Sequence, residues 1–354
     1  MVGRIVTHAH KSARNAGLNY ADPAAAGISR VRRGSGVAYR SAAGRVIRDA
    51  RTLDRIRALV IPPAWTAVWI AADARAHIQA TGRDAAGRKQ YRYHLLWTAE
   101  RDSTKYHRML AFADALPAIR RRIALDLRRP PASRAFVLAT VVALLERTHF
   151  RVGNEEYVRA NGSHGLTTLR DRHVKIRGRH LHFEFRAKSG VRQAIDFDDA
   201  RLARAVRICQ DLPGQVLFQY EDEKGDVRAV SSSDVNDYLR EASGGAFTAK
   251  DFRTWAGTLA AARELDTFEP PSSATAGKRS IVEAVDRVAE ALGNTRAVCR
   301  KCYIHPGVLE AYQAGLTIGR ITAGKGVSSK LREAEARLVT LLMKMSPAPQ
   351  KKAA

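Results

Sequence analysis

The sequence predicts an α+β protein, with a small β-rich N-terminal domain and a larger, mainly α-helical domain that carries a three-stranded β-meander. Short segments broken by Gly, Asp and Pro fill residues 29–100. Apolar residues recur at helical spacing over most of 101–345, and the period changes to two near 173–197. A basic arm at 1–28 and a tail at 346–354 complete the predicted organisation.

The first hundred residues show few strong patterns. Residues 1–28 lack apolar periodicity and end in a run of small residues, which predicts a flexible arm. Gly and Asp between 81 and 87 indicate a loop, and Pro62-Pro63 ends a short helix. The predicted elements are a helix at 52–59 and strands at 36–39, 67–71 and 91–97.

One segment of the larger domain alternates between apolar and polar side chains. Leu181, Phe183 and Phe185 alternate with polar residues, so one face of this strand is apolar. Glycine-containing turns at 177–179 and 188–190 flank the strand. The pattern predicts a meander with strands at 173–177, 180–186 and 191–197.

Helical spacing predicts most of the remaining elements. The breaker Pro130-Pro131 separates two long segments, and Thr248 followed by Asp251 resembles a capping box. The segment from Cys299 to Tyr303 falls between predicted helices, and we expect it to be mobile. The predicted helices are 103–127, 133–150, 199–210, 233–242, 249–266, 278–292, 305–314 and 329–344.

Composition narrows the class of partner. The 354 residues carry a formal net charge of +25, which favours a polyanion such as nucleic acid. A hydrophobic content of 45% excludes a disordered polybasic chain. The longest nearly apolar run, 135–145, is about half of the roughly 20 residues that a bilayer span needs, so we expect no membrane partner. Three cysteines exclude a disulfide scaffold and suit a reducing compartment, which predicts a cytoplasmic protein.

Three motifs that suggest cofactors are incomplete. Residues 319–325 have the spacing of a phosphate-binding loop, but Gly326 stands where a hydroxyl would hold Mg²⁺. Cys299 and Cys302 lack the second ligand pair of a zinc site. The carboxylates within 196–199 are able to bind Mg²⁺, but their place before a helix favours capping. We therefore expect no metal and no small-molecule cofactor.

Five other segments combine cationic side chains with a tyrosine. Arg151 follows a helix end, and Lys188 lies at the tip of a predicted hairpin. Lys250 and Arg253 share a face in the first turns of a helix. Another helix ends at Gly293, and Tyr303 follows nine residues after Asn294. Cations in such a set suit the binding of phosphate oxygens.

In this order, the segments resemble the type IB DNA topoisomerases, in particular the short poxvirus-like branch also found in bacteria. The resemblance covers roughly residues 30–315. It differs at one pocket position, where the poxvirus enzymes have histidine and this chain has Asn294. The matching segments are Arg151-Val-Gly, Leu166-Thr-Thr-Leu169, Lys188, Lys250–Trp255, Gly293–Tyr303 and, as the branch's DNA-facing strand, Gly87–Tyr93.

The resemblance implies a fold, a reaction and a set of catalytic residues. A small N-terminal clamp domain and a catalytic domain would surround duplex DNA, joined near residues 100–104. Tyr303 would attack a backbone phosphorus to form a transient 3′-phosphotyrosyl link, without ATP or metal. Arg151 and Arg253 would stabilise the transition state, and Lys188 would protonate the leaving oxygen. Asn294 would donate an amide N–H to a phosphate oxygen.

The resemblance also implies residues that contact the DNA. Gln90, Tyr91 and Tyr93 are expected to face the major groove, with Lys250 and Tyr157 as further contacts. The partner is duplex DNA, and the enzyme is expected to be a monomer associated with the nucleoid. For residues 90–93, an ordinary amphipathic strand is the alternative.

Two other functions stay open at the level of sequence. A tyrosine recombinase forms the same kind of tyrosine ester, but recombinases usually have histidine three residues before the second catalytic arginine, where this chain has Lys250. A non-catalytic DNA-binding protein would share the basic charge without forming a covalent link.

Overall fold

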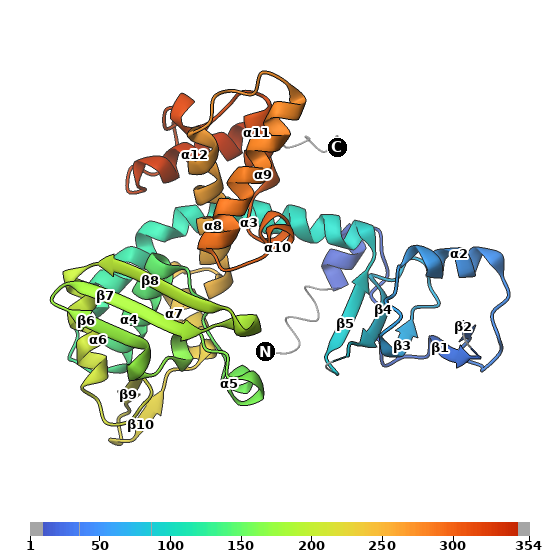
Figure 1. Cartoon of the computed structure of the whole chain (residues 1–354), viewed down its shortest axis with the longest axis horizontal. Helices are drawn as coiled ribbons and strands as arrows, with labels where there is room; N and C mark the ends of the chain where they lie inside the picture. The colour runs from blue at the N-terminus through green and yellow to red at the C-terminus, as the bar shows by residue number, and fades with distance from the viewer. Residues whose placement is uncertain (1–9, 35, 86, 346–354) are drawn as a thin grey trace. The chain divides into compact units, whose positions relative to one another are not determined.

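The computed structural model describes residues 10–34, 36–85 and 87–345. The chain divides into two compact units, residues 1–107 and 108–354. The helix α3, Leu95–Asp126, extends from the first unit into the second (Figure 1). The predicted junction at 100–104 therefore lies within a helix and not in a linker.

The first unit is built on an antiparallel five-stranded sheet with the strand order β2-β1-β3-β4-β5. Its core consists of small and branched apolar side chains from the sheet and from α2, among them Ile56 and Ile70. Asp49 caps α2 by accepting from the Thr52 N–H. The elements are β1 Ile28–Arg33, β2 Gly36–Arg40, α2 Ala50–Ala58, β3 Thr66–Ile70, β4 Ile78–Arg83 and β5 Lys89–Tyr93.

The predicted flexible arm is wrong for residues 10–28. Ala13 and Leu18 are buried against Trp97, and Asn19 forms a β-bridge with Ala76. Ile28 already begins β1. Residues 10–15 form a short helix, and the rest of the segment is held by a few local contacts, so it is too short and irregular for an apolar period to have predicted it. Residues 1–9 and 346–354 lie outside the described residues.

Two further predictions for this unit differ from the structure. Residues 81–83, predicted as a loop, end β4, whose residues are all buried except the last. Burial of both faces removes the alternation that identifies a strand. The predicted strand at 91–97 ends at Tyr93, and α3 begins two residues later at Leu95.

The second unit is mainly helical, with a three-stranded sheet of order β6-β7-β8 and a two-stranded sheet of β9 and β10. Its central helix α4 is buried along nearly its whole length. The predicted α+β class is confirmed. The elements are α4 Arg134–Thr148, α5 Glu155–Asn161, β6 Val174–Arg177, β7 His180–Arg186, β8 Arg192–Asp198, α6 Ala200–Gln210, β9 Gln219–Glu221, β10 Val227–Ala229, α7 Ser232–Ser243, α8 Ala249–Asp266, α9 Ala274–Ala291, α10 Arg296–Cys302, α11 Pro306–Gln313 and α12 Glu333–Met345.

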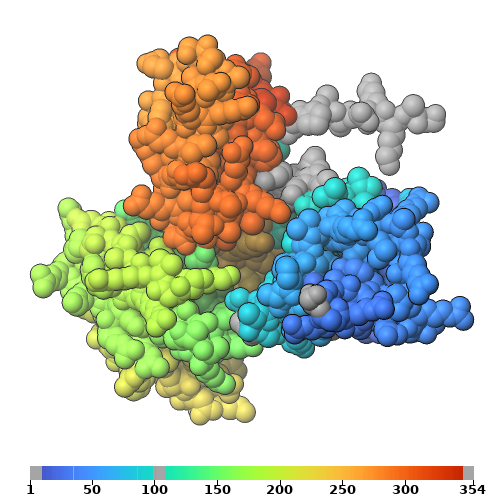
Figure 2. Space-filling view, turned by 45° about the vertical axis from the view of Figure 1, so that its right-hand side comes forward, coloured from blue at the N-terminus to red at the C-terminus, as the bar shows by residue number. Residues whose placement is uncertain are grey.

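The meander agrees with its prediction to within one residue at each strand end. Leu181, Phe183 and Phe185 are buried, whereas the residues between them are more exposed. Asp199 caps α6 by accepting from the Leu202 N–H, which is the capping role predicted for this acidic run. In the space-filling view, the green segment that contains the meander adjoins the orange C-terminal helices (Figure 2).

Candidate active site

The end of α4 determines where Arg151 begins its loop. His149 closes the helix in the left-handed region, with φ of 55°, and its N–H donates to the Leu145 carbonyl. Phe150 is buried with its ring edge-on to those of Phe183 and Phe185, at centroid distances of 6.0 and 4.9 Å. The chain therefore leaves α4 against the apolar face of the meander, with Arg151 next.

A second segment holds the Arg151 loop in place. The Leu166 N–H donates to the Arg151 carbonyl at 2.9 Å, and the Thr167 N–H donates to the Val152 carbonyl at 2.7 Å. A Cβ at Gly165 would lie 2.6 Å from both the Arg151 carbonyl oxygen and the nitrogen of Gly153. The two loops approach so closely that only glycine fits. This contact explains why residues 165–167 accompany Arg151 in the site.

Asn294 lies at the end of α9 and bonds to Arg151. Gly293 turns the chain with φ of 58°, and the Asn294 N–H donates back to the Ala289 carbonyl at 2.9 Å. The Arg151 guanidinium donates to Oδ1 of Asn294, whose Nδ2 donates to the Leu292 carbonyl at 3.1 Å. The Asn294 amide N–H, predicted to donate to a phosphate oxygen, thus donates to a backbone carbonyl in this structure. The reason is that Arg151, a pure donor, takes the amide oxygen.

Arg253 is held by the ends of two helices. It lies in the second turn of α8, which starts with the predicted Thr248–Asp251 capping box. The residue is 5% exposed, and its guanidinium donates to the carbonyls of His149 and Leu292, the latter at 2.8 Å. These carbonyls follow α4 and α9, so both helix ends fix the orientation of this cation.

Tyr303 lies directly above that cation. The Cζ atom of Arg253 is 5.1 Å from the centre of the Tyr303 ring, a cation–π distance. Residues 299–302, predicted to fall between helices, belong instead to the short helix α10, and Tyr303 closes it through an N–H bond to the Cys299 carbonyl. The segment is too short for its helical period to be read from the sequence. Tyr303 itself is half-buried.

The pKa shifts at the site arise because Arg151 and Arg253 lie close together and Arg253 is buried. Burial, followed by the charge of Arg151, lowers the pKa of Arg253, whereas the Tyr303 hydroxyl acts in the opposite direction. The Nε of Arg253 is buried without a hydrogen-bond partner. Burial and the Arg253 charge also lower the pKa of His149 to about 4. The arrangement is suited to receive an anion.

The depressed pKa of His149 predicts a pH-dependent stability. Between its unfolded pKa near 6.5 and about 4, the unfolded chain binds a proton that the folded protein excludes, so stability falls as the pH falls. Lowering the pH from 7 to 4.5 should cost about 2 kcal/mol through this group. The variant His149→Asn, which tolerates a left-handed backbone, should lose correspondingly less. Urea unfolding of both proteins at the two pH values measures this difference, and equal losses would contradict it.

Lys188 takes no part in the contacts that join the other predicted catalytic residues. It begins the turn between β7 and β8, is exposed, and forms no hydrogen bond or ion pair with any described residue. The same hairpin nevertheless reaches the site further along. The Gln193 side chain on β8 approaches Gly293 so closely that a Cβ there would lie 2.9 Å from Oε1.

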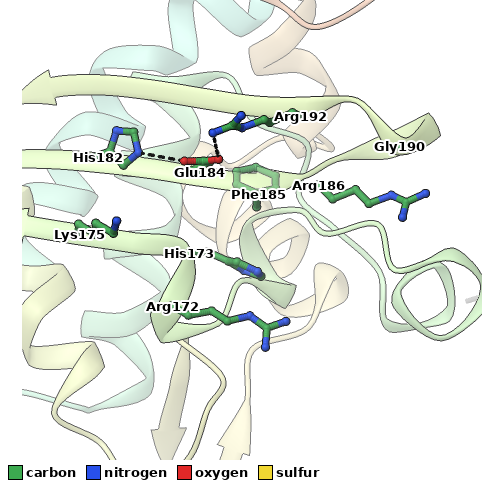
Figure 3. Close-up of a pocket in the computed structure, with 9 residues that line it drawn as sticks. All are labelled: Arg172, His173, Lys175, His182, Glu184, Phe185, Arg186, Gly190 and Arg192. Carbon is green, nitrogen blue, oxygen red and sulfur yellow. Dashed lines mark ion pairs between the residues drawn. The ribbon is translucent and has the colours of Figure 1, made fainter.

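A basic hollow of about 540 Å³ lies on the polar side of the meander, beside the Lys188 turn. Figure 3 shows Glu184 paired with His182 and Arg192, whereas the ends of Arg172 and Arg186 point away from this pair. The hollow adds positive charge next to the hairpin.

The predicted DNA-binding residues divide between the two units. In the first, Tyr91 and Tyr93 are exposed and stack at 5.9 Å, whereas Gln90 lies on the other face and donates to Asp84. The alternation of side chains along β5 separates them, so the three do not share one surface of the sheet.

In the second unit, Lys250 and Tyr157 are both exposed. Lys250 stands in the first turn of α8, whereas Arg253, three residues later, is buried.

Sequence reasoning missed the partners that hold the side chains predicted to be catalytic. The carbonyls of His149 and Leu292 are backbone atoms that no motif reveals. Gly257 and Thr258 lie against Tyr303. The sequence did offer a signal for this contact, because two small residues follow Arg253 one helical turn later, where another segment is able to pack closely.

The described parts of the chain contain neither a cluster of metal ligands nor a helix suited to span a membrane. Within residues 10–34, 36–85 and 87–345, no three His, Cys, Asp or Glu side chains are grouped as metal ligands. None of the helices in the same ranges combines the length and the apolar character that crossing a bilayer requires.

Comparison with known proteins identifies the family. The model of the eukaryotic DNA topoisomerase I catalytic core matches residues 88–324, and that of the bacterial DNA topoisomerase IB N-terminal domain matches residues 36–84. The DNA topoisomerase 1B of Acanthamoeba polyphaga mimivirus is 33% identical over 270 residues, which cover 74% of this chain and 80% of the viral protein. The chain therefore belongs to the type IB DNA topoisomerases, the enzyme family that its motifs resemble.

Proposed function

We propose that this enzyme relaxes supercoiled duplex DNA by cleaving one strand transiently, with Tyr303 as the nucleophile and a 3′-phosphotyrosyl link as the intermediate. The released 5′-hydroxyl then attacks this link and restores the strand, so neither ATP nor a metal ion is needed. The observation that carries the proposal is the position of Arg253, which two backbone carbonyls hold beneath the Tyr303 ring.

The two arginines supply the charge that the reaction needs. In the pentacoordinate transition state, negative charge concentrates on the non-bridging phosphate oxygens. A guanidinium binds two such oxygens at once and keeps its charge. Arg151 and Arg253 approach the same place from the ends of different helices, and Asn294 orients Arg151. The DNA phosphate would take the place of the Asn294 oxygen as acceptor for Arg151.

A phenol is a suitable nucleophile here. An ordinary tyrosine hydroxyl titrates near pH 10, so ionising it at pH 7 costs about 4 kcal/mol. In the proposed reaction the cations at the site stabilise the negative charge that develops on the phosphate oxygens as the phenol attacks. The ester that forms preserves the energy of the phosphodiester, which is why the strand rejoins without fuel.

The departing 5′-oxygen needs a proton, and we assign its delivery to Lys188. An alkoxide is a strong base, so a general acid at this position speeds cleavage. Lys188 stands on an exposed turn with a left-handed residue, Ser189, at φ of 65°. Binding of DNA would bring this turn to the phosphate, while Gln193 keeps the base of the hairpin beside Gly293.

The remaining residues would bind the duplex around the cleavage point. We assign backbone contacts to Lys250 and Tyr157, which are exposed on α8 and α5. The stacked rings of Tyr91 and Tyr93 offer an apolar surface to bases or sugars. Gln90 lies on the opposite face of β5 with its amide bonded to Asp84, so we assign it no base contact. We further propose that one copy of the chain suffices and that it acts on nucleoid DNA in the cytoplasm.

Relaxation of a supercoiled plasmid tests the proposal. The purified protein should relax the plasmid completely in EDTA without ATP, at one enzyme per several plasmids. A recombinase would do little on a plasmid without its target sites, and a non-catalytic DNA-binding protein would form no covalent link. A strict requirement for Mg²⁺ or ATP would contradict the mechanism, as would the absence of any relaxation.

A further inference from the structure

We propose that Thr258, together with Gly257, positions the segment that carries the nucleophile. This inference rests on the proposed role of Tyr303 and concerns residues that no catalytic motif includes. Thr258 is a positioning residue in this view, because it contacts the backbone on both sides of Ile304, the residue after Tyr303, and not the reacting atoms.

The Thr258 hydroxyl contacts three backbone groups. Its side chain is fully buried, and Oγ1 lies 2.8 Å from the Thr254 carbonyl and 3.1 Å from the Tyr303 carbonyl. The same oxygen accepts from the His305 N–H at 3.1 Å. Its single proton is shared between the two carbonyls, and a lone pair accepts the His305 N–H. The hydroxyl thus ties the residues before and after Ile304 to α8.

Gly257 allows the Tyr303 backbone to approach the helix. A Cβ at this position would lie 2.8 Å from the Tyr303 carbonyl oxygen and 3.0 Å from its Cβ. It would also lie 3.1 Å from Cδ1 of Leu292. Because real Cβ atoms avoid such distances, any side chain here would push Tyr303 away from α8.

One helix therefore sets the geometry between nucleophile and cation. Arg253 and Gly257 are four residues apart, which places them on the same face of α8, one turn from each other. Arg253 extends beneath the ring of Tyr303, and Gly257 with Thr258 contacts its backbone. Loss of the Thr258 hydroxyl would free the Tyr303–His305 segment while Arg253 stays fixed by its two carbonyls.

Paired variants test the role of the hydroxyl. Thr258→Val keeps the shape and removes the hydroxyl, whereas Thr258→Ser keeps the hydroxyl and removes a methyl group. We expect Thr258→Val to slow single-turnover adduct formation on a saturating duplex oligonucleotide by about 100-fold, the scale of a misplaced reacting group. The DNA dissociation constant should change by less than about twofold, and Thr258→Ser should stay within about threefold of the unmodified enzyme in both measurements.

A control variant separates the loss of positioning from the general effect of removing a buried hydroxyl. Thr140 on α4 is also fully buried, and its Oγ1 donates to the Phe136 carbonyl at 2.9 Å. Thr140→Val should therefore cleave at the unmodified rate. If Thr258→Val proves unstable to heat, Gly257→Ala tests the same contact from the other residue, with slow cleavage and intact DNA binding as the expected result.

The possible outcomes test this inference separately from the proposed function on which it rests. Cleavage by Thr258→Val at the unmodified rate would overturn the inference, as would a Thr258→Ser variant as slow as valine. In either case, a Tyr303 adduct in the unmodified enzyme would leave the proposed mechanism intact. A mass spectrum that locates the trapped DNA on another residue would instead overturn the mechanism, and the inference with it.

Discussion

Replacement of Tyr303 by phenylalanine is expected to abolish the covalent protein–DNA adduct and all plasmid relaxation. The substitution removes only the attacking oxygen. The ring keeps its position over Arg253, and the backbone bonds to Cys299 and Thr258 do not involve the hydroxyl. Binding of duplex DNA should therefore change little, since the cations that contact phosphate remain in place.

A suicide oligonucleotide, in which the cleaved end diffuses away, measures the adduct directly after denaturing electrophoresis. Tyr312→Phe provides a control for the loss of a tyrosine hydroxyl elsewhere in this unit, because Tyr312 donates its hydroxyl to the Glu269 carbonyl at 2.9 Å. That variant should form adduct normally. Residual relaxation by Tyr303→Phe would assign the nucleophile to another residue.

Substitution of Lys188 by alanine is expected to slow cleavage of a normal strand by about 10²- to 10⁴-fold, the usual contribution of a general acid. The loss should nearly disappear on a strand whose scissile 5′-oxygen is replaced by sulfur. A thiolate is a far weaker base than an alkoxide and leaves without a proton. Single-turnover cleavage rates on the two matched oligonucleotides give the ratio that identifies the acid.

Lys175 supplies the control for the charge of the lysine. It is an exposed lysine on the neighbouring strand β6 and lines the basic hollow beside the hairpin. Lys175→Ala should affect both substrates equally and weakly. If Lys188→Ala slows cleavage of both substrates to the same extent, the proton comes from elsewhere.

The parts of the fold that the sequence predicted are those with a clear period. The meander was predicted closely because Leu181, Phe183 and Phe185 face a core while their neighbours face solvent. The same reasoning missed β4, where both faces are buried, and α10, which is only seven residues long. It also misjudged residues 10–28, which fold through isolated contacts such as that of Leu18 with Trp97.

The sequence predicted the side chains of the candidate site, but not the backbone groups that hold them in place. The order of motifs pointed to Arg151, Arg253, Asn294 and Tyr303, and the structure groups these four residues. It leaves Lys188 exposed on its hairpin. The orientation of Arg253 depends on two carbonyls, which exist only once α4 and α9 have ended where they do.

The unpartnered Nε of Arg253 affects the stability of the folded protein. A buried cation that lacks one of its hydrogen bonds, with a second cation nearby, weakens the folded state before any substrate arrives. If Arg253 has the role proposed for it, this loss of stability accompanies a cation that is already in place for the phosphate. Selection for heat tolerance alone would then favour replacement of this arginine at the expense of the proposed activity.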